Sequence, residues 1–147
     1  MRYGRRFRVR APLAAVRAFH ADPRALEALT PPPLRVCWET LEPVKEGSRL
    51  AFSIGWGPLR LRWAAVHREV GPEGFTDEQV SGPFKRWVHR HHFRAVGSDL
   101  TEVEDEVEAE SAPGAVNGLV GRLLWWGVPL LFCYRALKTR KLLEESR

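Results

Sequence analysis

Hydrophobic and polar residues alternate along most of the chain, and a period of two predicts β-strands. In the first such segment, residues 3–10, an apolar-leaning face alternates with a face rich in arginine. Short turns separate six later segments of the same kind, and closely spaced strands of this sort pair as antiparallel hairpins. These later segments are residues 34–38, 50–54, 59–65, 75–79, 87–93 and 101–109.

Helical spacing governs the remaining parts of the chain. A first short helix is expected over residues 13–19, where apolar side chains recur every three residues. A second, over residues 22–29, begins with Asp22 as N-cap and Pro23 as first helical residue. A long helix follows the turn at residues 113–114. Because its middle is apolar nearly all round, we expect it to be buried on several sides.

Length and composition indicate the number of domains and the expected cellular location. Its 147 residues suffice for one compact domain, and the net charge is +5. The apolar run over residues 123–134 is free of charge for only 12 residues, whereas a bilayer span needs about 20. We therefore expect no membrane-spanning segment. Two cysteines provide no disulfide framework and fit a reducing compartment, so a cytoplasmic location is expected.

The order of elements and several local motifs resemble the START-like, or SRPBCC, superfamily. The order is one strand, two short helices, six antiparallel strands and a long helix. The sequences of several short segments are similar to those of bacterial ligand-binding SRPBCC domain proteins. The superfamily also includes polyketide cyclases. The segments that carry the resemblance are residues 19–23, 29–32, 74–79, 82–84, 87–93, 101–108, 113–114 and 132–135.

This resemblance implies a fold and a broad function. The implied fold is α+β of the helix-grip kind, in which a curved antiparallel sheet of about seven strands wraps a long C-terminal helix. Two short helices follow the first strand, and a single ligand-binding domain covers residues 1–147. Relatives bind lipids, quinones, steroids or aromatic polyketides, and a few are enzymes.

The arginines have an expected place in such a fold. In the superfamily the first strand lies beside the last, which would set the arginines of one strand against the glutamates of the other. Opposite charges across neighbouring strands attract weakly and neutralise each other. We therefore expect a solvated, self-neutralised face and no nucleic-acid partner. The residues are Arg6, Arg8 and Arg10 on one side and Glu102, Glu104, Glu106 and Glu108 on the other.

Polar side chains on the inward faces of three strands are the main candidates for a functional site. Hairpin pairing places Asp105 opposite His89 or His91, depending on register. Aromatic side chains share the same faces, and one tryptophan of the long helix is expected to line the cavity. The candidate ligand-binding residues are Trp63, Phe75, Asp77, Gln79, Trp87, His89, His91, Phe93, Asp105 and Trp126.

Three interpretations of the histidine–aspartate cluster remain open. In the first, these groups satisfy one another and hold the sheet together, since unpaired buried polar groups are costly. In the second, they form the polar end of an apolar cavity that binds or carries a hydrophobic or aromatic small molecule. In the third, His89 or His91 acts with Asp105 as general acid or base in a cyclase-like enzyme.

Metal, cofactor and assembly are the remaining questions. His89 and His91 with a carboxylate match a two-histidine, one-carboxylate metal site. Hydrogen-bonded histidine–aspartate pairs are more common, so we expect neither metal nor cofactor. The oligomeric state is open, and a homodimer is one option. A dimeric interaction protein with a filled interior is a third functional hypothesis, beside the carrier and the enzyme.

Overall fold

The computed structural model describes residues 1–145. Within that range one antiparallel sheet contains seven strands in the order β1-β7-β6-β5-β4-β3-β2. Two short helices follow the first strand, and a long helix follows the last. The elements are β1 (Arg2–Val9), α1 (Leu13–Ala21), α2 (Ala25–Ala28), β2 (Arg35–Leu41), β3 (Arg49–Trp56), β4 (Leu59–Gly71), β5 (Gly74–Ser81), β6 (Phe84–Gly97), β7 (Leu100–Ser111) and α3 (Ala115–Glu144).

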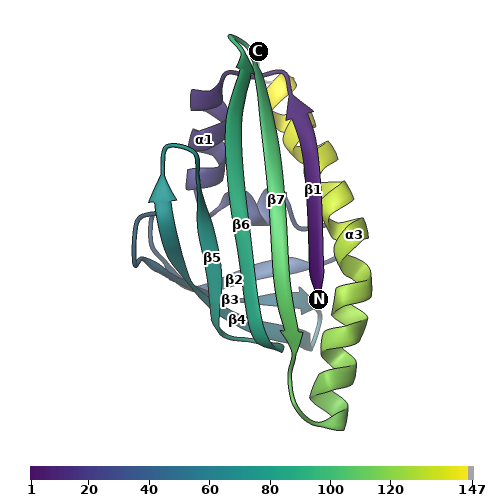
Figure 1. The fold of residues 1–147 in the computed structure, drawn as a ribbon. Coiled ribbons are helices and arrows are strands. Elements are labelled where there is room, and N and C mark those ends of the chain that lie inside the picture. The colour runs from purple at the N-terminus through teal and green to yellow at the C-terminus, as the bar shows by residue number, and fades with distance from the viewer. Residues whose placement is uncertain (146–147) are drawn as a thin grey trace.

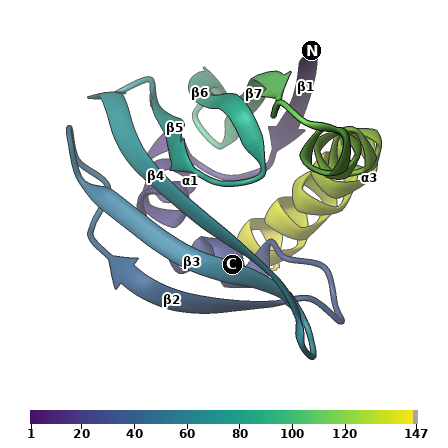
Figure 2. The same ribbon diagram turned by 90° about the horizontal axis from the view of Figure 1, so that it is seen from below.

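The sheet curves so strongly that its two edges lie on different sides of the molecule. β1, β7 and β6 stand beside α3, whereas β4, β3 and β2 turn beneath them (Figure 1). Seen from below, the helices lie within this curve (Figure 2). Pairing shifts between β4 and β5, at Ala64/Ala65 and at Arg68/Gly71, accompany the bend, as β-bulges do. The predicted α+β helix-grip fold is confirmed.

Two apolar clusters fill the concave side of the sheet. One joins Phe7, Val16 and Phe93 near α1 and the end of α3. The other joins Trp87 and Phe132 near the middle of α3. Along the inner face of β6, Trp87 belongs to one cluster and Phe93 to the other. The polar positions between these two aromatic residues therefore lie between two packed cores.

The long helix is less buried than its composition predicts. α3 packs against β1, β6 and β7, with Gly121, Val128 and Phe132 among its buried residues. The opposite face exposes large apolar side chains, including Trp126 and Leu130, and only 17% of the most apolar 18-residue window is buried. The expectation of burial on several sides is wrong, because the sheet covers α3 from one side only. By length and hydropathy alone, α3 is long and apolar enough to cross a membrane. Core helices of soluble domains share these two properties, so this is weak evidence for a membrane span.

The outer face of the sheet carries the expected charges. β1 pairs with β7, so that Arg6 lies opposite Glu104 and Arg8 opposite Glu102. The Arg6 Nη2 to Glu104 Oε1 distance is 2.7 Å. Arginines of β6 approach β7 from its other side, so the glutamates of β7 lie between two basic strands. Arg10 lies beyond the end of β1 and pairs with Glu144 of α3.

Candidate functional site

A cavity of about 570 Å³ lies between the concave face of the sheet and the three helices. Most of its wall is apolar. α3 contributes one helical stripe, whose members follow one another at spacings of three or four residues: Val120, Leu124, Val128 and Leu131. Leu34 and Leu59 also border the cavity and are exposed to solvent. The mouth therefore lies where the β3–β4 hairpin faces the first half of α3.

One wall carries a chain of alternating histidines and aspartates. β4 supplies His67, β5 supplies Asp77, β6 supplies His89 and His91, and β7 supplies Asp105. The chain follows from register, because His67 pairs with Asp77 across β4 and β5 and His91 pairs with Asp105 across β6 and β7. All five side chains lie on the concave side, where period-two alternation places them.

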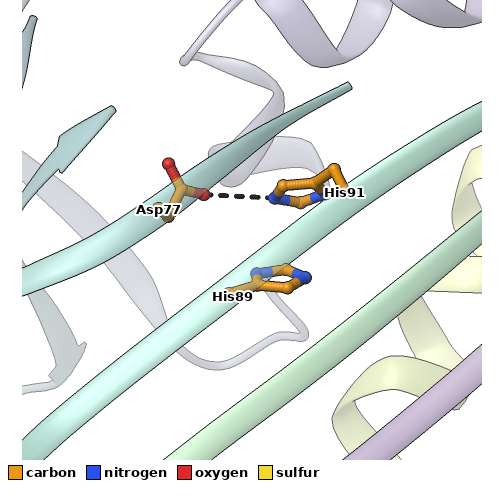
Figure 3. A group of neighbouring side chains, drawn as sticks. All are labelled: Asp77, His89 and His91. Carbon is orange, nitrogen blue, oxygen red and sulfur yellow. Dashed lines mark hydrogen bonds and ion pairs between the residues drawn. The ribbon is translucent and has the colours of Figure 1, made fainter. Parts of the chain in front are cut away.

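The links of this chain are short. His67 Nε2 lies 3.1 Å from Asp77 Oδ1, and His91 Nε2 lies 3.1 Å from Asp77 Oδ2. The other nitrogen of the same ring, His91 Nδ1, lies 3.1 Å from Asp105 Oδ1. His89 Nε2 is 2.9 Å from that oxygen. Figure 3 shows His91 directed at Asp77, with His89 beside it.

The central histidine carries the positive charge of the cluster. Burial alone would lower the pKa of His91, but the carboxylates of Asp105 and Asp77, each 3.1 Å from one of its ring nitrogens, raise that pKa to about 9. Burial alone would raise the pKa of each aspartate. Hydrogen bonds from His89 and His91 hold the pKa of Asp105 well below its usual range, and those from His67 and His91 do the same for Asp77. At neutral pH an imidazolium therefore lies between two carboxylates.

His89 and His20 stay neutral. Burial and the charge of His91 lower the pKa of His89 to about 4, despite the hydrogen bond to Asp105. Burial and the same charge lower the pKa of His20 to about 4. Since neutral His89 donates from Nε2 to Asp105, its Nδ1 carries a lone pair. Within residues 1–145 this Nδ1 has no hydrogen-bond partner, and the ring lines the cavity.

A cation from the long helix completes the polar lining. Arg135 of α3 borders the cavity, and its Nε lies 3.4 Å from the backbone oxygen of Leu29. Its guanidinium carbon lies 5.4 Å from the centre of the Phe132 ring. Burial lowers the pKa of Arg135, although the charges of Asp105 and Asp77 oppose that shift. The guanidinium is thus a desolvated cation at the polar end of an apolar cavity.

Six of the ten sequence-predicted residues line the cavity, and the other four lie elsewhere. Gln79 donates its side-chain amide to the backbone oxygen of Phe84 and ties the β5–β6 hairpin instead of facing the cavity. Phe93 packs in the core near α1, and Asp105 lies behind the histidines. Trp126 is 76% exposed on the outer face of α3, so its predicted position in the cavity wall is wrong. Those that do line the cavity are Trp63, Phe75, Asp77, Trp87, His89 and His91.

Three basic side chains near the cluster were not among the predicted site residues: His67, Arg135 and His20. His67 was detectable, because it continues the inward alternation of Trp63 along β4. Arg135 lies four residues after Leu131 and extends the apolar stripe of α3, which is an unusual place for a cation. His20 gave no comparable signal, and only the packing of α1 on β6 brings its ring within 6.1 Å of His91.

The cluster also contains atoms that a metal ion would require. Ligand atoms of Asp77, His89 and His91 lie within 4.8 Å of one another. Both ring nitrogens of His91 nevertheless face carboxylates at 3.1 Å, and the protonated ring has no free lone pair. A metal would have to displace that proton. The donor set therefore fits a proton-bridged ion cluster better than a metal site.

Solved structures from several organisms share this fold. The Zhui aromatase/cyclase from Streptomyces sp. R1128 matches with a TM-score of 0.77 at 14% identity, over 98% of this chain and 93% of that one. A START superfamily protein from Mycobacterium smegmatis matches with a TM-score of 0.68 at 15% identity, over 99% of each chain. Norcoclaurine synthase from Thalictrum flavum, in complex with dopamine and hydroxybenzaldehyde, matches with a TM-score of 0.67 at 15% identity, over 100% of this chain and 88% of that one.

Family membership rests on sequence as well as fold. A search of curated proteins gives no significant match. The family model described as polyketide cyclase / dehydrase and lipid transport matches residues 9–129. Together with the START neighbour, this match confirms the resemblance to the START-like superfamily. The chain therefore belongs to the polyketide cyclase/dehydrase and lipid transport family.

Proposed function

We propose that the protein binds and carries a hydrophobic or aromatic small molecule in its cavity. The observation that supports this most is an apolar chamber of about 570 Å³ whose polar groups converge on one wall. Small-molecule sites have this form, with an apolar body and a few polar groups that orient the ligand. The description of the family, which includes lipid transport, agrees with this function.

The titration of the cluster favours binding over acid–base catalysis. An efficient general acid or base has a pKa near the working pH. The pKa of His91 is about 9 and that of His89 about 4, so neither histidine exchanges its proton readily at neutral pH. Both nitrogens of His91 are also engaged with carboxylates. The cluster is therefore suited to holding a fixed charge pattern against a ligand.

Cavity filling tests the carrier function. Leu61 lines the cavity, whereas Val80 is exposed on β5 and does not. Native mass spectrometry and solvent extraction of purified protein should recover an apolar molecule. Leu61→Trp should lower the bound fraction about tenfold or more, and the control Val80→Trp should leave it unchanged. If preparations are empty and the neutral apolar probe N-phenyl-1-naphthylamine does not bind, the proposal fails.

A cyclase-like activity is a second candidate, and one observation favours it. Asp105 orients His89 while the Nδ1 lone pair of His89 remains unpaired at the cavity wall. If a bound substrate brings negative charge beside His89 and so raises the pKa of that ring, this pair becomes a base. His89→Gln should then abolish conversion of the recovered ligand and leave its affinity nearly unchanged. Equal loss of conversion and affinity would favour binding alone.

A further inference from the structure

Arg135 differs from the arginines of the outer sheet face. Arg6, Arg86 and Arg94 each lie within 4.0 Å of a glutamate on β7. Among residues 1–145, no carboxylate oxygen lies within that distance of Arg135. Its hydrogen bond to Leu29 occupies Nε alone, at 3.4 Å. Within the described part of the chain, neither terminal nitrogen of this guanidinium forms a hydrogen bond.

We propose that Arg135 anchors a carboxylate, so that the ligand is an amphipathic acid with an apolar body and a planar anionic head. This inference rests on the proposed carrier function and names the chemical class of the ligand. A guanidinium offers paired N–H donors that match the two oxygens of a carboxylate. In a desolvated site such a pair is stronger than any hydrogen bond to a neutral alcohol.

The nearby carboxylates do not fulfil this role. Asp77 and Asp105 attract Arg135 electrostatically, but neither forms an ion pair with it at 4.0 Å or less. Their oxygens are already engaged with His67, His89 and His91. The imidazolium of His91 offsets one of the two negative charges. Arg60, the other arginine of the lining, is exposed and donates to Ser53 and to the backbone oxygen of Arg35. An anionic head at Arg135 would thus meet the less exposed of the two lining arginines, whose terminal nitrogens form no hydrogen bond within the described residues.

The shape of the cavity supports the same orientation. Val120 and Arg135 lie on one stripe of α3, 15 residues apart, which corresponds to about 22 Å of helix. The polar end of this stripe lies at Arg135, and the apolar end lies near the mouth beside Leu59. A ligand with its acid at Arg135 and an apolar tail toward Leu59 would satisfy both ends.

Paired probes with one chain length test the assignment. Dodecanoate and dodecan-1-ol are titrated against the full chain by displacement of N-phenyl-1-naphthylamine at pH 7.5. The wild type should bind dodecanoate about tenfold or more tightly than the alcohol, as expected for a desolvated ion pair. Arg135→Met should remove this preference by weakening dodecanoate alone. The control Arg122→Met, on the exposed side of α3, should preserve it.

Each other outcome overturns the inference. Equal affinity of the wild type for both probes excludes an anion anchor, and this needs no variant. Equal weakening of both probes in Arg135→Met shows that the arginine only holds α3 to Leu29. If Arg135→Met does not fold, dodecanoate and its methyl ester are compared on the wild type, and equal affinities overturn the inference. If the naphthylamine probe itself does not bind, the carrier function fails as well.

Discussion

The two faces of the strand pair β6–β7 carry acid–base arrays of opposite character. On the outer face, long arginine and glutamate side chains pair at the solvent boundary, as Arg86 does with Glu108. On the inner face, short histidine and aspartate side chains form a buried chain centred on His91. Alternation along a strand sends neighbours such as Glu104 and Asp105 to opposite faces. Adjacent carboxylates of one strand thus enter different dielectric environments.

This difference in burial determines how each array responds to salt and to substitution. Exposed pairs are screened by water and salt, and each is replaceable by a neighbouring pair. Buried groups have no alternative partner, so the removal of one leaves another charged or unpaired. The inner array also shifts the pKa values of His89 and His91 in opposite directions. Such a pattern is a better indicator of a site than charge density on the surface.

Substitution of Asp105 should have the largest effect. Asp105→Asn keeps the shape but removes the negative charge that His89 and His91 share. Breaking a buried charge pair costs about 3–5 kcal/mol of unfolding free energy. Urea denaturation followed by tryptophan fluorescence measures it. Glu104→Gln, one residue away on the outer face, is the matched control and should change stability little. Similar losses in both variants would erase the distinction between the faces.

The pH dependence of stability should follow His91. Its pKa is raised from 6.5 to about 9, so its contribution is complete below pH 6.5 and is lost as pH rises through 9. The shift corresponds to about 3 kcal/mol. The difference in unfolding free energy between wild type and His91→Gln should therefore shrink from pH 6.5 to pH 9.5. A difference independent of pH over this range would show that His91 is neutral in the folded protein.

Period-two patterning predicted much of this arrangement. Strand identity and the inward direction of His89 and His91 follow from alternation. The pairing of the first strand with the last was implied by the resemblance to the superfamily, and the sheet order confirms it. Register across the last hairpin stayed open between the two histidines. The structure pairs Asp105 with His91 on the ladder, yet the carboxylate also reaches His89. The hydrophobic pattern predicts which residues share a face, but it does not predict that the Asp105 side chain also contacts a histidine two positions along the neighbouring strand.

Helices were harder to interpret than strands, for a physical reason. A helix that is apolar all round does not reveal which side meets the sheet, so Trp126 was placed in the cavity although it faces solvent. Arg135 was not among the predicted site residues, because a cation near a helix C-terminus is common and does not by itself indicate a site. The position of His20 depends on how α1 packs over β6, a tertiary contact that local sequence does not specify.

The smallest expected effect is the salt dependence of stability, which should differ between variants of the outer face and variants of the inner face. Arg6 pairs with Glu104 and Lys85 pairs with Glu110 at the surface, at 2.7 and 3.1 Å. At about 1 M NaCl the screening length falls to about 3 Å, so exposed pairs of this kind lose most of their attraction. The small stability difference between wild type and the double variant Arg6→Gln/Lys85→Gln should disappear in high salt. The deficit of Asp105→Asn should persist there, because buried charges are screened far less. If high salt reduced both differences in proportion, the inner chain would be as solvated as the outer ladder.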